Sequence, residues 1–271
     1  MADARARDLN WPRHSVPFPE MTRLRWLGHS TVVLETGGLR LLTDPVLRTG
    51  IGPIRRRPEL VDHDLDAIDA VLISHLHHDH LDLASMRLLR RQILVIVPAG
   101  AGRLLRSSGF AAVTELDEGQ STTLGDTVIR AVHARHSGRR IPFGPSAPAL
   151  GFVIEGEHSI YFAGDTDLFP EMAELSPDLD LAILPVGGWG PTLSGGHMDP
   201  VRAAEALTLL RPRAAVAIHW GTLWPVGMSR VRRERFEDPA RRFIEEASRI
   251  APDVLIPLLD PGDRFEVPSS D

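Results

Sequence analysis

Residues 74–82 read Ser74-His75-Leu76-His77-His78-Asp79-His80-Leu81-Asp82, and they follow an apolar run typical of a buried strand, residues 69–73. Four of the chain's 12 histidines fall within six residues here. Imidazoles this close repel one another once protonated, and they are costly to remove from water without partners. A divalent cation relieves both costs. The stretch therefore predicts a metal site at the end of a strand.

The spacing within this stretch favours two cations over one. Side chains alternate along an extended strand end, so His75 and His77 point the same way and can share a metal. Asp79 and His80 come after the chain has turned, and they can reach a second metal. Histidine-rich tracts also arise from composition alone. This one lies between a strand pattern and an amphipathic run, residues 81–91, which favours the metal site.

Composition is that of a globular protein, with 43% hydrophobic and 24% charged residues among 271. The formal net charge of -6 argues against a general nucleic-acid binder, because phosphate recognition needs an excess of basic residues. The chain has no Cys, so a metal site must use nitrogen and oxygen ligands. No signal segment and no apolar run near the ~20 residues of a membrane helix is present. We expect a cytoplasmic protein with no membrane partner.

Periodicity predicts a layered α/β fold. Residues 1–20 contain three prolines and no repeat, and they are expected to form an arm before a single domain, residues 21–271. Strands are expected at 22–27, 31–35, 39–43, 69–73, 93–97, 120–124, 127–133, 150–155, 159–163, 181–185, 214–218 and 254–257. Helices are expected at 81–91, 101–108 and 200–210 and after Pro239. Because strands outnumber helices and hairpins are frequent, we predict two mixed sheets packed face to face with helices outside.

Three further candidate ligands lie at other strand ends. His136, Asp165 and His219 each follow an expected strand and have Gly nearby, as a close backbone approach requires. Taken singly, each is more simply interpreted as a surface or helix-capping residue. Taken together, they supply the ligands that residues 74–82 lack for two metals.

Seven motifs give the chain a family resemblance over residues 22–222. They are Trp26-Leu27-Gly28-His29-Ser30, Leu42-Thr43-Asp44-Pro45, residues 74–82, His136-Ser137-Gly138-Arg139, Ala163-Gly164-Asp165-Thr166, Gly196-His197-Met198-Asp199-Pro200 and Ile218-His219-Trp220-Gly221. In this order they resemble the metallo-β-lactamase superfamily. The closer resemblance is to the branch with ascorbate-6-phosphate lactonase and N-acyl-phosphatidylethanolamine phospholipase D.

The resemblance implies an αββα sandwich with a dinuclear metal site at one edge. It places a first metal on His75, His77 and His136 and a second on Asp79, His80 and His219, with Asp165 bridging them. It implies that a metal-bridged hydroxide is the nucleophile and that Asp79 orients it. Zinc is the default metal for a His-rich site, and manganese or iron would also suit these ligands. His78 occupies a position that the motif leaves open.

Other residues carry weaker predictions. The resemblance places His197 near the substrate, where it could contact an oxyanion or leaving group, or stabilise its loop. His29 is expected to have a structural or ligand-orienting role, and Asp44 is expected either to orient a ligand histidine or to cap a turn. Arg139 and its neighbour Arg140 could meet an anionic substrate, although solvated loop arginines are equally plausible. Trp189 is a candidate for substrate binding, although a packing tryptophan is the plainer interpretation. Specificity is expected in the loops 46–62, 137–148, 187–197 and 223–237.

These predictions favour a metal-dependent hydrolase that cleaves a phosphodiester or a lactone of an anionic small molecule. The four positive charges of two divalent metals exceed the two negative charges of Asp79 and Asp165. The site is therefore locally positive and attracts anions, although the chain as a whole is acidic. One alternative is a membrane-associated phospholipase D acting at a phospholipid surface. Another is a metal-bearing binding or sensor protein without hydrolysis. The sequence leaves a homo-oligomer open.

Overall fold

Apolar runs of the sequence become strands in the computed structural model, which describes residues 8–9, 21–57, 65, 67–140, 144–190, 193, 195–227 and 238–268. Among these residues, seven strands form a first sheet in the order β17-β2-β3-β4-β7-β8-β9. They are β2 (Arg23–Gly28), β3 (Thr31–Thr36), β4 (Leu39–Thr43), β7 (Ala70–Leu72), β8 (Leu94–Pro98), β9 (Val113–Leu116) and β17 (Arg264–Glu266). The pairing is antiparallel from β17 to β4 and parallel from β4 to β9.

A second sheet repeats this division into antiparallel and parallel halves. In the described part of the chain its order is β1-β10-β11-β12-β13-β14-β15. Its strands are β1 (Asp8–Leu9), β10 (Ser121–Leu124), β11 (Thr127–His133), β12 (Leu150–Glu155), β13 (Ser159–Phe162), β14 (Leu181–Pro185) and β15 (Ala214–Ile218). Pairing is antiparallel from β10 to β13 and parallel from β13 to β15. Apart from β1, the predicted arm of residues 1–20 lies outside the described residues.

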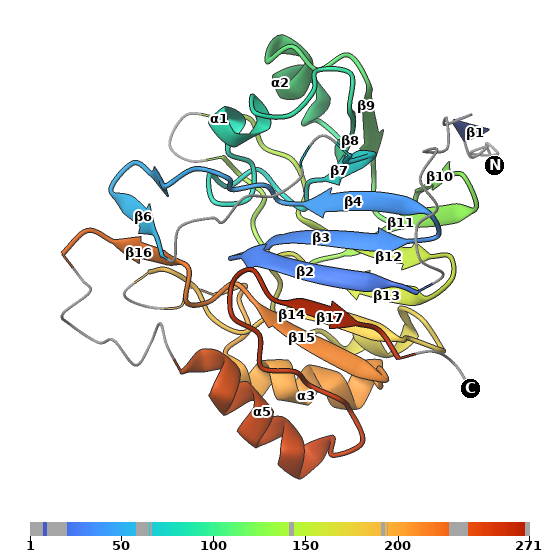
Figure 1. Ribbon diagram of the computed structural model, residues 1–271, viewed down its shortest axis with the longest axis vertical. Coiled ribbons are helices and arrows are strands. Elements are labelled where there is room, and N and C mark those ends of the chain that lie inside the picture. Colours follow the sequence, from blue (N-terminus) through green and yellow to red (C-terminus); the bar gives the residue numbers. More distant parts are fainter. Residues whose placement is uncertain are drawn as a thin grey trace.

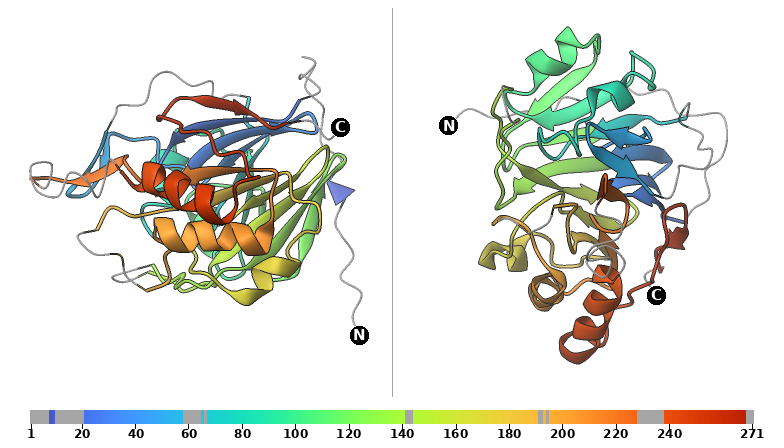
Figure 2. Two further views of the ribbon diagram at one scale, coloured as in Figure 1. Left: turned by 90° about the horizontal axis from the view of Figure 1, so that it is seen from below. Right: turned by 90° about the vertical axis from the view of Figure 1, so that its left-hand side faces the viewer.

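The two sheets pack face to face, with helices on their outer faces (Figures 1 and 2). The helices α1 (Leu83–Met86) and α2 (Gly102–Ser107) lie beside the first sheet, and α3 (Pro200–Leu210) and α5 (Pro239–Ile250) lie beside the second. A 3-10 turn, η1 (Pro170–Glu174), contacts α3. The predicted αββα sandwich is confirmed. No helix within the described ranges is both long and apolar enough to cross a bilayer.

The first sheet is buried on both faces, because alternate side chains along its strands enter different apolar clusters. Val32 and Leu34 of β3 belong to the core between the sheets, together with Phe152 of the second sheet. Val33 points to the other face, where it joins the cluster that includes Leu105 of α2. Because both faces are covered, the strands read as nearly continuous apolar runs.

Two expectations about elements were wrong. The helix predicted over 81–91 is only α1, because the chain continues from Arg87 in turns whose amides bond three residues back, as Leu89 N does to Met86 O. Leu81, Met86 and Leu89 are still buried, so the apolar pattern records packing rather than a helix. Residues 254–257 contribute an isolated bridge between Leu255 and Ala214, and the last strand is β17. The short strand β9 was also missed.

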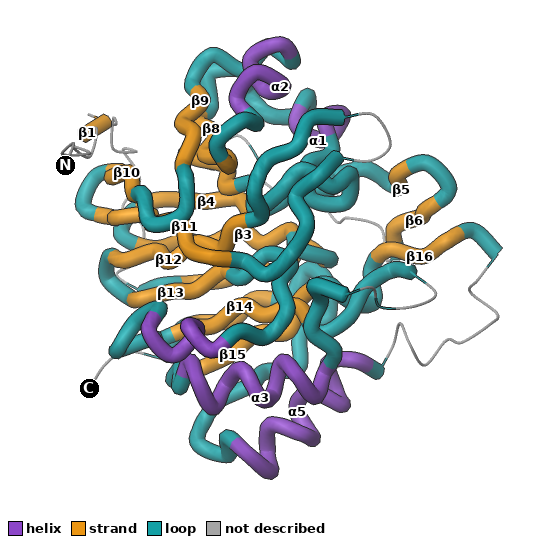
Figure 3. Tube along the Cα trace, turned by 180° about the vertical axis from the view of Figure 1, so that it is seen from behind, coloured by secondary structure: helices purple, strands orange, loops and turns teal. Residues whose placement is uncertain are grey.

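A small third sheet lies beside the ends of β2 and β4 (Figures 1 and 3). It pairs β5 (Gly50–Ile51), β6 (Ile54–Arg56) and β16 (Leu223–Pro225). Two of the loops expected to set specificity, 46–62 and 223–237, thus pair with each other. The buried guanidinium of Arg56 donates to the carbonyls of Val46 and Leu27 and ties this sheet to the end of β2. The loops' remaining parts, 58–62 and 228–237, lie outside the described residues.

The end of β2 gives a stability prediction. Gly28 has φ 110°, and a Cβ there would lie 2.8 Å from Thr222 Cγ2 and 2.9 Å from Arg56 Nη2. Gly38 also has a positive φ, 74°, but a Cβ there would meet nothing within 4 Å. Both Ala variants incur left-handed strain, and only Gly28→Ala adds overpacking, which costs ~1–3 kcal/mol. We expect chemical denaturation to show Gly28→Ala less stable than Gly38→Ala by that margin. Equal stabilities would contradict the packing described here.

Candidate metal centre

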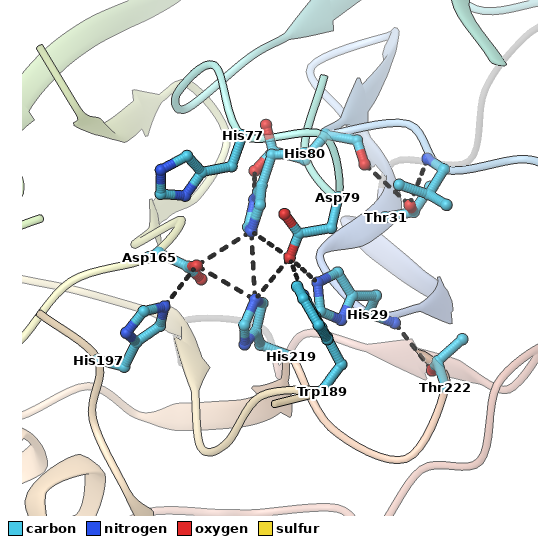
Figure 4. A network of polar contacts seen from close by, with 12 residues as sticks. His29, Thr31, His77, Asp79, His80, Asp165, Trp189, His197, His219 and Thr222 are labelled. Atoms are coloured by element: carbon cyan, nitrogen blue, oxygen red, sulfur yellow. Dashed lines mark hydrogen bonds and ion pairs between the residues drawn. The ribbon is translucent and has the colours of Figure 1, made fainter. Parts of the chain in front are cut away.

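The candidate centre lies where strands of both sheets end at one edge of the sandwich. Its side chains come from the loops after β2, β4, β7, β11, β13 and β15: His29, Asp44, residues 74–82, His136, Asp165 and His219. Figure 4 shows the carboxylates of Asp79 and Asp165 among the imidazoles. Parallel neighbours end at the same sheet edge, so residues far apart in the sequence meet there.

One group of imidazoles consists of His75, His77 and His136. One ligand atom from each lies within 4.8 Å of the others. His136 Nε2 is 3.2 Å from His77 Nδ1, and its Nδ1 is 2.8 Å from the carbonyl oxygen of Gly196. This carbonyl accepts the proton of Nδ1, which leaves Nε2 with its lone pair toward His77. These three rings are the set that the resemblance assigns to a first metal.

The second group consists of Asp79, His80 and His219, joined by His29. The Nε2 atoms of His80 and His219 are 3.2 Å apart, and each lies 3.7 Å from Asp79 Oδ2. His219 Nδ1 donates to the carbonyl oxygen of Gly187 at 2.8 Å, which turns Nε2 toward the other ligands. The set that the resemblance assigns to a second metal is therefore also brought together.

Asp165 lies between the two groups. Its Oδ2 is 3.1 Å from His80 Nε2, 3.2 Å from His219 Nε2 and 4.0 Å from His75 Nε2. His197 Nε2 lies 3.2 Å from the same oxygen. Asp165 Oδ1 is buried without a hydrogen-bond partner. This carboxylate has the central position expected of a bridging ligand.

The residues present fit metal ions. Besides Asp165 Oδ1, the ring nitrogen Nε2 of His75 is buried without a hydrogen-bond partner. Such atoms are costly to bury unless something pairs with them. His80 and His219 bring two Nε2 atoms to 3.2 Å, and a shared cation stabilises such a contact better than protons do. The donor set is nitrogen and oxygen, which suits zinc, manganese or iron.

The imidazoles of the site fall into two kinds, those whose pKa is lowered and those whose pKa is raised. Burial lowers the pKa of His75 well below its usual value and that of His136 to about 4. Burial acts in the same direction on His219 and His80, but the neighbouring carboxylates outweigh it. With Asp165 as the largest of these influences, the pKa of His219 rises to about 9 and that of His80 well above its usual value. Near neutral pH the metal-free site therefore holds protons on His80 and His219.

Metal binding is expected to expel these protons. Imidazole binds a metal only when neutral, so at pH 7 a divalent ion must displace the protons on both His80 and His219. Because both pKa values are raised, apparent metal affinity should increase with pH through the range in which His219 loses its proton, at about 9. Titration calorimetry in buffers of different ionisation enthalpy measures the released protons. A binding enthalpy that is independent of the buffer would contradict this charge assignment.

Three residues hold the ligands in place. The buried carboxylate of Asp44 accepts from His80 Nδ1 at 2.7 Å and from Ser74 N at 2.7 Å. His29 Nε2 donates to Asp79 Oδ2 at 3.0 Å, and Trp189 Nε1 donates to the same oxygen at 2.8 Å. His29 has φ 52°, and its amide donates to Thr222, so the chain is fixed in the turn that aims this ring. The positions of His29 and Asp44 agree with an orienting role.

A cavity of about 850 Å³ opens above the centre. Its lining includes His77, Asp79, Asp165, His197 and His219, the apolar residues Ile51, Pro53, Ile54 and Leu193, and Trp189, His78, Arg48 and Asp82. The structure thus brings His197 and Trp189 to the cavity.

Arg139 does not reach the cavity. It is exposed and its backbone forms an isolated bridge with Ser146. Its neighbour Arg140 is buried instead, and it donates to the carbonyls of Leu76 and Leu81. Sequence reasoning missed Arg48, and it did not foresee that Arg140 turns inward onto the carbonyls of Leu76 and Leu81. A pattern of two adjacent arginines gives no signal for which of them turns inward.

Comparisons with known proteins agree with this geometry. A family profile described as beta-lactamase superfamily domain matches residues 39–220. N-acyl-phosphatidylethanolamine-hydrolyzing phospholipase D 1 of Caenorhabditis elegans is 30% identical over 299 residues, covering 98% of this chain and 83% of that protein. A metal-dependent hydrolase of Methanopyrus kandleri is 30% identical over 250 residues, covering 90% and 99%.

A solved structure supports the same fold. A metallo hydrolase of Ignicoccus hospitalis superposes with a TM-score of 0.69 at 22% identity, over 92% of this chain and 100% of that one. The profile match covers most of the chain, and each of the two relatives aligns with at least 90% of it. The chain therefore belongs to the beta-lactamase superfamily domain family, within the metallo-β-lactamase superfamily of metal-dependent hydrolases.

Proposed function

We propose that the chain is a dinuclear metal-dependent phosphodiesterase acting on a small molecule that carries an apolar substituent. The observation that carries this proposal is the position of Asp165 between two groups of ligand side chains on the floor of one cavity. The C. elegans relative, a phospholipase D, supports the choice of a phosphodiester.

The residues that would hold the metals are the two groups described above. His75, His77 and His136 would bind one ion, and Asp79, His80 and His219 would bind the other, with Asp165 shared. When bound, two divalent ions supply Lewis acidity and lower the pKa of a coordinated water toward neutrality. Zinc is the first candidate for both positions, with manganese or iron as the alternatives.

The chain's own residues orient the reaction. Asp79 is held through Oδ2 by His29 and Trp189, so its carboxylate faces the other ligands in a fixed orientation. That position suits a group that aligns the nucleophile and accepts its proton. His197 lines the cavity and reaches Asp165, where it can donate to a developing negative charge on the substrate or the leaving oxygen.

The cavity walls indicate what else the substrate carries. Ile51, Pro53 and Ile54 come from the small third sheet, and Leu193 and Trp189 come from the loop after β14. Apolar walls of this kind bind alkyl or aryl groups by removing them from water. A phosphodiester with one apolar ester group would fill both parts of the cavity. A lactone of a phosphorylated molecule remains the alternative on the same centre.

A phospholipid substrate is a second candidate, favoured by apolar groups near the cavity. Leu193 lines the cavity and is 40% exposed, and Val226, next to β16, is 64% exposed. Cosedimentation with vesicles of phosphatidylcholine, with and without phosphatidylserine, tests this candidate. Absence of binding to both kinds of vesicle removes it and leaves soluble phosphodiesters.

The experiment for the proposal compares bis-p-nitrophenyl phosphate, p-nitrophenyl phosphate and a lactone panel on metal-loaded protein. We expect the diester to be hydrolysed with the highest kcat/KM and activity to vanish in the metal-stripped protein. If only lactones are hydrolysed, the phosphodiesterase is wrong and the lactonase alternative takes its place. Full activity without metal would refute the proposal.

A further inference from the structure

His78 is the histidine of residues 74–82 whose role the metal sites leave open. Among the described residues, the groups able to hold a metal include His75, His77 and His80 but not His78. Its side chain is exposed and lines the cavity beside Asp79. A ring that faces the substrate cavity next to a metal ligand is placed to contact a bound molecule.

Arg140 contacts the Nδ1 side of the His78 ring. The Arg140 residue is only 8% exposed. Its Nη1 donates to the carbonyls of Leu76 at 2.8 Å and Leu81 at 2.9 Å, and its Nη2 lies 3.0 Å from His78 Nδ1. The two carbonyls lie on either side of residues 77–80, so one buried cation spans this part of the ligand stretch and fixes its shape.

This contact determines where the ring carries its proton. A guanidinium has donors and no acceptor, so His78 Nδ1 must present its lone pair to Arg140. In the neutral ring the proton then resides on Nε2, the nitrogen that Arg140 does not contact. The positive charge behind the ring also polarises it, which makes the Nε2–H a stronger donor.

We propose that Arg140 fixes His78 as the Nε2–H tautomer and that this N–H donates to an anionic oxygen of the substrate. His78 is thus a substrate-contacting residue and Arg140 is its positioning residue. The substrate part rests on the proposed function, since it assumes a phosphoryl oxygen in the cavity. Arg48 also lines the cavity, but it is a weaker candidate for this contact than His78. Its Nε and Nη2 already donate to Asp82 at 2.7 and 2.8 Å.

The tautomer is tested without any catalysis. Long-range 15N–1H correlation spectra of histidine-labelled, metal-free protein distinguish a protonated from an unprotonated ring nitrogen. We expect His78 to show an unprotonated Nδ1 and a protonated Nε2, and Arg140→Met to yield a mixture of tautomers. The variant His78→Phe assigns the signals. A proton on Nδ1 of His78 in the wild type would overturn the proposal.

Anion binding tests the contact with substrate. Inorganic phosphate is titrated into metal-loaded wild type, His78→Phe and His78→Gln, with metal content measured for each. Loss of one hydrogen bond to a charged oxygen should weaken binding in His78→Phe about ten- to hundredfold, and Gln, which keeps a terminal N–H, should restore most of it. His133→Phe replaces an exposed histidine outside the cavity lining and should bind as the wild type does.

The outcomes separate this proposal from the proposed function. Phosphate affinity within twofold of wild type in a fully metal-loaded His78→Phe would overturn the contact. Loss of phosphate binding in His78→Phe without recovery in His78→Gln would also overturn it, since that result indicates lost packing. A wild type that binds phosphate through His78 but hydrolyses no ester would refute the phosphodiesterase and leave the contact standing.

Discussion

Replacing Asp165 by Asn is expected to lower kcat/KM about a thousandfold, ~4 kcal/mol of activation free energy, and to reduce metal content. Asp165 Oδ2 lies 3.1–3.2 Å from the Nε2 atoms of His80, His197 and His219. The field of His219 and His80 overcomes burial and keeps the pKa of Asp165 well below its usual value, so this side chain is a carboxylate at working pH. Asn has the same shape but no charge, and it cannot bridge two cations.

A matched control lies two residues further along the chain. Asp167 forms an ion pair with Arg202, with Arg202 Nε 2.7 Å from Asp167 Oδ1, and it is absent from the cavity lining. Asp167→Asn should therefore keep wild-type metal content and kcat/KM within a few-fold. The measurements are elemental analysis and steady-state kinetics on bis-p-nitrophenyl phosphate. Asp165→Asn with full metal content and unchanged kcat/KM would show that this carboxylate is not a ligand.

Replacing Asp44 by Asn is expected to weaken binding of one metal about ten- to hundredfold. The two oxygens of Asp44 accept from Ser74 N, from Ser74 Oγ and from His80 Nδ1, each within 2.7 Å. An amide would turn one acceptor into a donor facing another donor, so His80 would lose its orientation. Competition with a chromophoric chelator measures the affinity.

Asp69→Asn provides the comparison for Asp44→Asn. Asp69 is also buried, but it lies at the opposite end of β7 and accepts from Arg40 N. The Asp69→Asn variant should have an altered stability and an unchanged metal affinity. If both variants lose affinity equally, the effect belongs to the sheet as a whole and the orienting role of Asp44 is wrong.

The strands and the meeting of the ligands could be predicted because each depends on a local pattern. Residues 150–154 are apolar throughout because both faces of the strand are covered, and β12 (Leu150–Glu155) has the predicted bounds. His136, Asp165 and His219 were identified from their position just after strands. Parallel strands carry such positions to one edge, which is why the three side chains meet residues 74–82.

Other features depend on contacts that a local pattern does not encode. The turns after α1 bury Leu89 as a helix would, so the apolar spacing of 81–91 could not distinguish them. The third sheet joins β6 to β16 across more than 160 residues of sequence. The choice between Arg139 and Arg140 depends on the carbonyls of Leu76 and Leu81, which are available only once the ligand stretch has folded.

The most direct test of the dinuclear centre is a metal titration of the stripped protein, with hydrolysis of bis-p-nitrophenyl phosphate measured at each step. Zinc and manganese are added in defined equivalents, and bound metal is determined by elemental analysis. We predict negligible hydrolysis in the stripped protein and activity that rises until two ions are bound per chain. Full hydrolysis by the stripped protein, or saturation of both binding and activity at one ion, would contradict the account.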